Sequence, residues 1–441
     1  MKRPVVIILL VVALLFVLAG IGAVAFFAIN NGGNFFTGRM QSFATVEESK
    51  TIKVDAESPV ILKVIDDAGS VTVVGANVDS VQVKVVKTAH ATTQARADEE
   101  VKIIKYSIEQ NGNTVTLSYK VPNIATYPPN VTVFDLNVDT IDFVITVPNE
   151  TIVDVDNNLG EVSVSNIKGN AVIVNDFGAV IVDDIEGALS VETNSGEVNA
   201  TSIVAGGENI DLQSDFGNIT LEKASGADIT LNSNSGVIRL TEVRATGDLT
   251  TKTDFGDTQF ENGSADLLNI ETNSGKVSLI KLKISKELKV DNDFGEIELE
   301  QASAGSYDLH TNSGGITVDG ARNKVKAYTD FGNITIENAQ SVTLDLKTNS
   351  GTIEFSGSLG EGPHNVKSDF GGIDISLPSD SKLNVDLNTD FGKISSDISI
   401  TVTLTESSGS DKSQIIGSIN GGGDLLTVQT NSGGINIKVI K

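Results

Sequence analysis

Cysteine and tryptophan are absent from this 441-residue sequence, and histidine occurs only three times. Without cysteine the chain can form neither a disulfide nor a thiolate metal site. His90, His310 and His364 are far apart in the sequence, so we do not expect a histidine-based metal or catalytic centre. Proline is also scarce, with 8 residues against 42 glycines. Most turns should therefore depend on glycine.

Basic residues are outnumbered by acidic ones, 32 to 58, which gives a formal net charge of −26. Nucleic-acid binding needs a basic face, so this balance excludes a nucleic-acid partner. A strongly acidic surface favours a soluble chain whose copies repel one another.

Two tripeptides recur along the chain and alternate without a break from Gly178 to Gly371. Their glycines lie about 19 residues apart, a period that indicates a repeat architecture. Asp-Phe-Gly begins at Asp176, Asp215, Asp254, Asp293, Asp330, Asp369 and Asp390, and Asn-Ser-Gly begins at Asn194, Asn234, Asn273, Asn312, Asn349 and Asn431.

Apolar residues fall at every second position on both sides of these glycines, as in Ile219 and Leu221 after Gly217. Period two indicates strands with one buried face. One unit cannot bury that face alone, so the units must stack. The sequence therefore predicts an all-β, single-stranded β-solenoid (β-helix) with coils of about 19 residues. A 39-residue coil with four strands is the alternative.

The same parity predicts where the motif side chains point. Phe216 and Ser235 should face inward, where a large ring stacked on a small side chain fills the corner. Asp215 and Asn234 should face outward, so that carboxylates lie two coils apart and repel less. The glycines are best explained by a positive φ at the turn.

The sequence indicates the fold more clearly than any catalytic or binding function. Asp-Phe-Gly occurs in protein kinases, but seven copies without a glycine-rich phosphate loop or a His-Arg-Asp loop exclude that function. Asp and Asn could bind calcium, yet they also suit a purely structural ladder, which we favour. A catalytic site should break a repeat once, whereas these residues recur everywhere. We therefore expect no enzyme, no catalytic, metal or cofactor-binding residues, and no cofactor.

The N-terminal region predicts a membrane anchor. Residues 5–29 carry no charged or strongly polar side chain, and 25 helical residues span roughly 38 Å, enough for a bilayer. Lys2 and Arg3 in the tail, residues 1–4, should stay in the cytoplasm. We expect a single-pass protein of the cell membrane with an extracytoplasmic C-terminal domain after a linker, residues 30–51. A cleaved signal peptide at Ala23-Val24-Ala25 is the alternative.

Residues 52–150 depart from the repeat and predict a first coil followed by a β-rich insertion. Residues 92–105 should form a short amphipathic helix, and Asn111-Gly112-Asn113 a hairpin turn. The insertion should cap the open edge of the solenoid, although a binding role is possible. Residues 151–441 should form the regular stack, with a hairpin-like C-terminal cap before the final strand.

A lysine island stands out in the acidic stack, at Lys276, Lys281, Lys283, Lys286 and Lys289. We interpret it as a solvated face, with contact to an anionic polymer as the alternative.

The motifs Asp-Phe-Gly-x-Ile and Thr-Asn-Ser-Gly-x-Val/Ile, with the closing residues 391–397, 417–423 and 430–435, resemble the bacterial putative-adhesin family of β-strand repeat proteins. The resemblance covers about residues 52–441 and implies a bacterial, membrane-associated or surface β-solenoid. It brings no catalytic or binding residues.

Three functions fit these observations. The first is an adhesin or interaction scaffold that binds an unknown surface ligand, polysaccharide or protein, and is held to the membrane by its N-terminal helix. The second is an envelope-stress or regulatory ectodomain that works through a membrane partner. The third is a polysaccharide-active enzyme, which would need one acidic cleft outside the repeat.

Overall fold

The computed structural model describes residues 42–55, 58–121, 138–408 and 412–440. The predicted tail at 1–4, membrane helix at 5–29 and most of the linker lie outside these residues. No helix within the described ranges is long and apolar enough to cross a membrane. The chain divides into two compact units, the first made of Met1–Glu47, Val86–Ile104 and Ala125–Thr140, and the second, here called the solenoid unit, of Glu48–Val85, Lys105–Ile124 and Ile141–Lys441.

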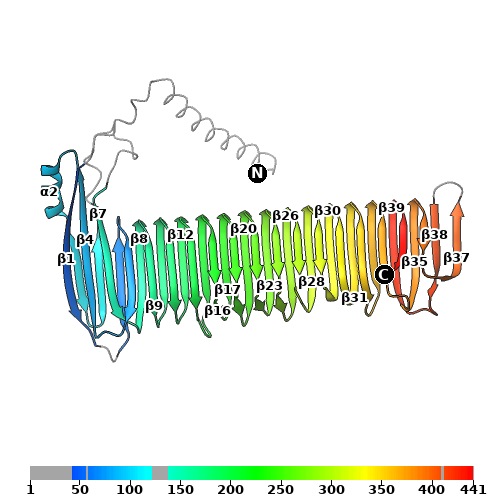
Figure 1. The fold of residues 1–441 in the computed structure, drawn as a ribbon, viewed down its shortest axis with the longest axis horizontal. Helices are drawn as coiled ribbons and strands as arrows, with labels where there is room; N and C mark the ends of the chain where they lie inside the picture. Colours follow the sequence, from blue (N-terminus) through cyan, green and yellow to red (C-terminus); the bar gives the residue numbers. More distant parts are fainter. Residues whose placement is uncertain (1–41, 56–57, 122–137, 409–411, 441) are drawn as a thin grey trace, which may run out of the picture. The chain divides into compact units, whose positions relative to one another are not determined.

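Each regular coil of the solenoid unit contains a long strand, a turn at a motif glycine and a shorter strand (Figure 1). In one coil these are β14 (Ile210–Phe216) and β15 (Ile219–Glu222). β14 pairs in parallel with the long strands one coil earlier and one coil later. Ile210 therefore lies beside Ile229, 19 positions further along the chain. This register confirms the 19-residue coil and excludes the 39-residue alternative.

The regular coils repeat this arrangement from residue 151 to residue 377. The long strands are β8 (Thr151–Leu159), β10 (Ala171–Phe177), β12 (Leu189–Ser195), β14, β17 (Ile229–Ser235), β20 (Asp248–Phe255), β23 (Leu267–Ser274), β26 (Glu287–Phe294), β28 (Ser306–Ser313), β30 (Arg322–Phe331) and β33 (His364–Phe370). The shorter strands are β9 (Val162–Ile167), β11 (Val180–Ile185), β13 (Val198–Ile203), β15, β18 (Ile238–Thr241), β21 (Thr258–Glu261), β24 (Val277–Ile280), β27 (Ile297–Glu300), β29 (Ile316–Asp319), β32 (Ile353–Leu359) and β34 (Ile373–Leu377).

Two variations complete the regular stack. β31 (Ile334–Ser350) bends through two sides of the solenoid and serves as both a shorter and a long strand. A third side carries four very short strands in a separate sheet, β16 (Ser225–Gly226), β19 (Arg244–Ala245), β22 (Ser264–Ala265) and β25 (Lys283–Ile284).

The core lies inside the coils and consists of the alternating apolar residues that the sequence predicts. Ile210 and Leu212 of β14, and Ile219 and Leu221 of β15, are at most 1% exposed. Burying each such side chain contributes about 1.5–3 kcal/mol. Where the pattern has Thr258 and Phe260 instead, both are buried, and Gly263 makes room for the ring, because a Cβ there would lie 2.1 Å from Phe260.

The predicted inward direction of the motif phenylalanine and serine is wrong. Phe216 is 66% exposed, and Ser235, its neighbour in the next coil, is exposed as well. The inward position at this corner belongs to Ser214 instead, which is 1% exposed. Period-two parity holds along a straight strand but fails here, because the backbone turns immediately after Ser214.

Close approach between coils requires the motif glycines, and six of them also have the predicted positive φ, namely Gly178, Gly256, Gly275, Gly295, Gly371 and Gly433. A Cβ on Gly217 would lie 1.9 Å from the carbonyl oxygen of Gly196, and one on Gly236 would lie 2.0 Å from that of Gly217. Gly217 and Gly236 are not among the glycines with a positive φ. The predicted explanation is therefore confirmed for the six glycines above, whereas at Gly217 and Gly236 the close approach alone accounts for the glycine. The backbones pass so closely at this corner that no side chain fits between them.

The insertion takes the capping position that the sequence predicts. β2 (Val60–Asp66) and β3 (Val71–Ala76) form a coil around Gly69. On one side they pair with β8 and β9. On the other side they pair with β6 (Thr114–Tyr119) and β7 (Thr140–Pro148), which belong to the insertion. The insertion thus adds a coil beyond the first one in sequence.

The other predicted elements of this region are also present. β5 (Tyr106–Asn111) and β6 form an antiparallel hairpin around Gly112, whose φ is +59°. In the first unit, α2 (Gln94–Ile103) buries Ala97 and Val101, and the Thr93 hydroxyl accepts a hydrogen bond from the Arg96 N–H. β1 (Ser42–Lys53) pairs with β4 (Ser80–Ala91). Residues 42–51 are therefore a strand rather than part of the predicted linker, because their alternating pattern suits strand pairing.

The C-terminal region forms the predicted hairpin cap but orders its coils unexpectedly. β37 (Ile400–Ser408) and β38 (Lys412–Ile419) are antiparallel, and β38 pairs with β35 (Leu383–Phe391). The chain then returns. β39 (Asp424–Ser432) enters between β33 and β35, and β40 (Ile435–Val439) between β34 and β36 (Ile394–Ser396). In Figure 1 the red β39 accordingly stands among orange strands.

Candidate functional site

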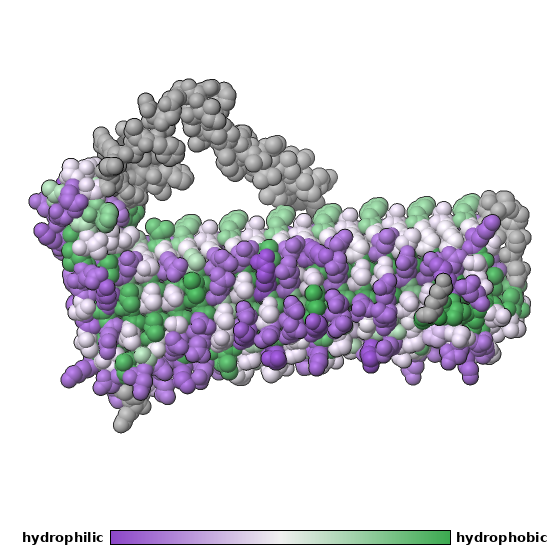
Figure 2. Space-filling model, viewed as in Figure 1, coloured by the Kyte–Doolittle hydropathy of each residue, from purple (hydrophilic) through white to green (hydrophobic). Residues whose placement is uncertain are grey.

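The most unusual surface of the solenoid unit is a line of exposed phenylalanines at the corner after the long strands. These side chains are 54–67% exposed. Figure 2 shows regularly spaced hydrophobic side chains along one long edge. Here the name phenylalanine row means Phe177, Phe216, Phe255, Phe294, Phe331, Phe370 and Phe391.

A serine separates neighbouring phenylalanines in the row. Phe255 pairs with Ser235 on one side and with Ser274 on the other. Coils in a β-sheet stack lie about 4.8 Å apart, so the rings repeat every ~9.6 Å. Alternation of large and small side chains is what the sequence predicts, but it lies on the outside of the molecule.

The C-terminal rearrangement preserves this alternation in space although the sequence breaks it. Two Asp-Phe-Gly motifs follow each other at Phe370 and Phe391, without an Asn-Ser-Gly motif between them. Because β39 enters between their coils, Ser432 pairs with both Phe370 and Phe391. Simple duplication of a two-coil unit does not explain this. The position in the stack, rather than the order in the chain, determines which residue occurs.

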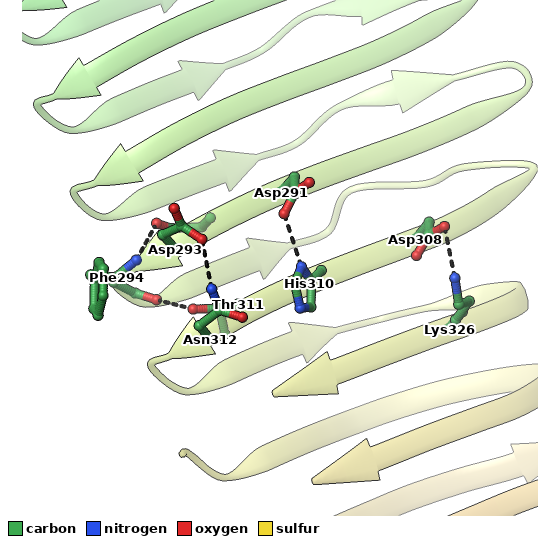
Figure 3. Close-up of polar contacts among 10 residues, drawn as sticks. Asp291, Asp293, Phe294, Asp308, His310, Thr311, Asn312 and Lys326 are labelled. Atoms are coloured by element: carbon green, nitrogen blue, oxygen red, sulfur yellow. Dashed lines mark hydrogen bonds and ion pairs between the residues drawn. The ribbon is translucent and has the colours of Figure 1, made fainter. Parts of the chain in front are cut away.

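The outward Asp/Asn column runs beside the row and is held by hydrogen bonds, as predicted for a structural ladder. Asn234 Nδ2 donates to Asp215 Oδ1 at 2.9 Å, and Asn273 donates to Asp254 at the same distance. Asn312 donates to Asp293 at 2.6 Å (Figure 3). Six of the seven motif carboxylates, all but Asp390, thus receive a donor from the next coil, and carboxylates lie two coils apart, which confirms the predicted spacing.

Buried hydroxyls and amides hold the same corner from inside. Ser214 Oγ donates to the Gly196 carbonyl at 3.1 Å, and Thr311 Oγ1 donates to the Gly295 carbonyl at 3.1 Å. Phe294, the ring next to that glycine, projects away from the end of its strand (Figure 3). The rings are therefore presented on a corner whose backbone is fixed by glycine packing and internal hydrogen bonds.

A column of outward side chains on the long strands flanks the row, two residues before each Asp or Asn. Here the name flanking column means Asp156, Val174, Glu192, Gln213, Asn232, Lys252, Glu271, Asp291, His310, Tyr328, Lys347, Lys367, Gln429 and Asn388, in the order of the stack.

The flanking column changes in character along the solenoid. His310 Nδ1 lies 2.9 Å from Asp291 Oδ1, and its ring stacks on Tyr328 with centroids 5.2 Å apart. Lys347 Nζ lies 5.1 Å above the Tyr328 ring. The Tyr328 hydroxyl donates to Asp330, and this bond, with burial second, raises the pKa of Tyr328. The charged members are acidic near one end, at Asp156 and Glu192, and basic towards the other, at Lys347 and Lys367.

Two of the five side chains in the lysine island, Lys276 and Lys286, are paired with carboxylates. Lys276 Nζ lies 2.7 Å from Glu298 and 3.7 Å from Glu296. Lys286 lies 2.9 Å from Asp266, and hydrogen bonding to this carboxylate raises the pKa of Lys286. These pairs support the interpretation of a solvated face.

Acidic side chains do not converge on a metal or catalytic centre in the part of the chain that the structure describes. No group of three or more His, Asp or Glu side chains there is placed to hold a metal ion. A shallow cavity of about 200 Å³ lies on the ladder side, lined by Lys252, Asp254, Glu271, Asp291 and Asp293 among others. His90, His310 and His364 are not brought together in such a group.

Asp66 is a buried carboxyl at the first coil. It is 1% exposed, and its Oδ1 accepts a hydrogen bond from the Ala68 N–H at 3.3 Å, whereas Oδ2 has no partner among the described residues. Burial, followed by the nearby charges of Asp142 and Asp67, raises the pKa of Asp66 to about 8. It pairs with Asn157, at the position that Asn, Ser or Thr takes in other coils.

Sequence reasoning identified every motif residue of this corner but missed the surface that it forms. The available signal was the break in motif order at Phe370 and Phe391. If the repeat served only to pack the coils, the returning strand β39 would not need to restore the alternation of phenylalanine and serine.

A family model and two solved structures are similar to this chain. A family model described as Toastrack DUF4097 matches residues 64–263 and 262–438. No curated protein matches the chain. A solved structure titled a putative cell adhesion protein from Clostridium sporogenes is 10% identical, covering 90% of this chain and 100% of that one, with a TM-score of 0.17. A structure titled a putative adhesin from Bacteroides fragilis is 11% identical, covering 90% and 97%, with a TM-score of 0.19.

Proposed function

We propose that this chain, which belongs to the Toastrack DUF4097 family and whose described residues form a β-solenoid, is an adhesin or interaction scaffold. In this proposal the N-terminal segment anchors it in the cell membrane, and the solenoid unit lies outside the cytoplasm. The phenylalanine row is its contact surface, and no catalysis is involved.

One observation carries this proposal, namely that the exposed rings recur at every second coil even where the chain order changes. Soluble monomers rarely expose a contiguous apolar surface larger than about 300–600 Å², and larger ones mark interaction sites. The seven exposed rings follow one edge at a regular spacing, with a serine between neighbouring rings. Because Ser432 separates Phe370 from Phe391 only through the insertion of β39, the alternation is a property of the surface itself.

The absence of catalysis is proposed from the repetition of the polar groups. The carboxylates nearest the row, such as Asp215 and Asp254, accept hydrogen bonds from the asparagines of the next coil. A general acid or base needs a distinct environment that separates its pKa from that of its partner. The ladder gives successive carboxylates nearly the same environment.

A binding experiment tests the adhesin proposal. The full chain, kept in a non-ionic detergent, is incubated with cell-wall polysaccharide and with whole envelope fragments, and the supernatant is assayed for released sugar. We expect retention without sugar release. A triple variant, Phe255→Ser, Phe294→Ser and Phe331→Ser, should lose retention at least ~10-fold, given that truncating a central aromatic contact typically costs over 1 kcal/mol.

The matched control is Phe43→Ser. Phe43 is 63% exposed, like the rings of the row, but lies outside it. It should keep wild-type retention. Sugar release would favour a polysaccharide-active enzyme over a scaffold. If the triple variant were retained as well as the wild type, the phenylalanine row could not be the contact surface. Retention on envelope fragments but not on polysaccharide would favour a membrane protein partner, as in the regulatory alternative.

The proposed orientation has its own test, since the chain contains no cysteine. Asp380 is exposed on the solenoid unit, so Asp380→Cys introduces a single reactive thiol. A membrane-impermeant maleimide should label it on intact cells. Labelling only after cell lysis would place the solenoid unit in the cytoplasm and contradict the proposal.

A further inference from the structure

The phenylalanine row offers enough apolar area for a stable protein interface. An aromatic side chain has about 150–250 Å² to bury. Seven rings that are 54–67% exposed therefore present roughly 600–1,100 Å². A standard protein interface buries about 800 Å² on each partner. The row alone thus matches the area that one side of a dimer needs.

The alternation of large and small residues restricts what can cover the row. A close-fitting partner must present a small group opposite each phenylalanine and a large one opposite each serine. This pattern must change every ~4.8 Å over the whole length of the row. A second copy of the same row, antiparallel and displaced by one coil, has the required period. Six of the seven rings then meet a serine, for example Phe255 opposite Ser313 of the other copy. Phe391, at the end of the row, meets Leu159.

The direction of the second copy follows from symmetry and charge. A twofold axis parallel to the solenoid axis places the same coil of both copies at the same height, so each phenylalanine would face the same phenylalanine of the other copy. A twofold axis perpendicular to it reverses the direction and permits the one-coil displacement. The same reversal, with the one-coil displacement, places Glu192 of the flanking column at the height of Lys367 in the other copy. By contrast, Glu271 lies at the height of Asp291. Charge complementarity such as that between Glu192 and Lys367 contributes to fixing register and orientation.

We propose that the phenylalanine row is a homotypic docking surface, on which a second copy of this chain lies antiparallel and displaced by one coil. The inference rests on the proposed function, because it names the partner of the same row. Anionic polymers and anionic membranes are disfavoured partners, since the Asp ladder runs beside the rings and the net charge is −26. That charge also weakens the dimer at low ionic strength, so salt should strengthen it.

Sedimentation velocity of the full chain in a non-ionic detergent measures the association directly. We expect a dimer that tightens as salt rises from about 20 mM to 500 mM. The Debye length then falls well below 10 Å, which screens the repulsion between the two negatively charged copies. The triple variant Phe255→Ser, Phe294→Ser and Phe331→Ser should weaken dimerisation at least ~10-fold, whereas Phe43→Ser should leave it unchanged. Circular dichroism of each variant verifies that the solenoid is intact.

Single cysteines test the antiparallel register, because the native chain has none. In the proposed dimer, with the two rows aligned over their full length, Ser195 of one copy lies about one coil from Ser432 of the other. Two copies of Ser195 lie about nine coils apart, roughly 43 Å at strand spacing. A mixture of Ser195→Cys and Ser432→Cys should therefore be joined by a short bismaleimide, while Ser195→Cys alone should not.

The outcomes separate this inference from the proposed function. A chain that stays monomeric at every salt concentration, or a dimer that ignores the triple substitution, overturns homotypic docking. Crosslinking of Ser195→Cys with itself overturns the antiparallel arrangement. If the chain is monomeric yet its retention on polysaccharide or envelope still requires the row, the scaffold function stands with a different ligand. If neither association nor retention depends on the row, both proposals fail.

Discussion

Replacing one motif glycine by alanine should destabilise the solenoid far more than an ordinary glycine substitution. A Cβ on Gly217 would lie 1.9 Å from the Gly196 carbonyl oxygen and 2.9 Å from Ser214 Oγ. Real Cβ contacts essentially never fall below 3.0 Å, so the two coils would have to separate locally by about 1 Å. Both neighbours of the new methyl group belong to the fixed corner rather than to a flexible side chain.

The magnitude follows from the bonds that this separation strains. The Ser214 Oγ bond to the Gly196 carbonyl is 3.1 Å long, and the Val198 N–H bond to the Asn218 carbonyl is 2.9 Å. Losing two hydrogen bonds costs about 1–3 kcal/mol, and overpacking adds about 1–3 kcal/mol. We therefore expect Gly217→Ala to lower the free energy of unfolding by ~2–6 kcal/mol.

Urea denaturation followed by circular dichroism measures this loss, with Gly207→Ala as the matched control. A Cβ on Gly207 would have nothing within 4 Å, and its φ is not positive. Alanine there should be neutral or stabilise by about 0.4–1 kcal/mol through the unfolded state. If the two variants unfolded within about 0.5 kcal/mol of each other, close packing of the coils could not be the reason for the motif glycine.

Three further predictions test the corner and its surroundings. Asp66→Asn should stabilise the protein at pH 8–9 by several kcal/mol, because the folded pKa of Asp66, about 8, lies above the ordinary value of 3.8. The stability that protonated Asp66 contributes is complete below pH 4 and is lost as pH rises through 8. Urea melts at several pH values should therefore show that the advantage of the variant vanishes near pH 4. Asn234→Asp should cost about 1–2 kcal/mol at pH 7, because it removes the bond to Asp215 and places the new carboxylate ~4.8 Å from the coils of both Asp215 and Asp254. Acid should relieve the repulsive part, and a constant deficit down to pH 3 would argue against repulsion. Phe216→Ser should lower the free energy of unfolding by less than about 2 kcal/mol in thermal or urea melts, since only a third of the ring is covered. Phe260→Ser, in the core, should lower it by about 3–5 kcal/mol. Equal losses would mean that the row is structural rather than a contact surface.

The sequence alone was sufficient for the local rules of this protein. Period-two alternation and a 19-residue spacing predict stacked coils, and Ile210 and Ile219 are buried as that pattern requires. The alternation of Asp215 with Asn234 predicts a ladder with separated carboxylates, and their 2.9 Å hydrogen bond confirms it. These features depend on neighbours that are close in sequence or exactly one repeat away, so a repeating pattern contains them.

Only the tertiary structure decided the side-chain directions at the corner after the long strands and the order of the C-terminal coils in the stack. Phe216 faces outward because the backbone turns after Ser214, and a parity count carries no information about a turn. The need for Gly217 comes from the Gly196 carbonyl, an atom of the preceding coil that only stacking brings within 1.9 Å of a Cβ. The place of Ser432 between Phe370 and Phe391 depends on β39 returning past the hairpin cap. Each of these depends on long-range pairing, and together they turn a repeat motif into a regular row of exposed rings.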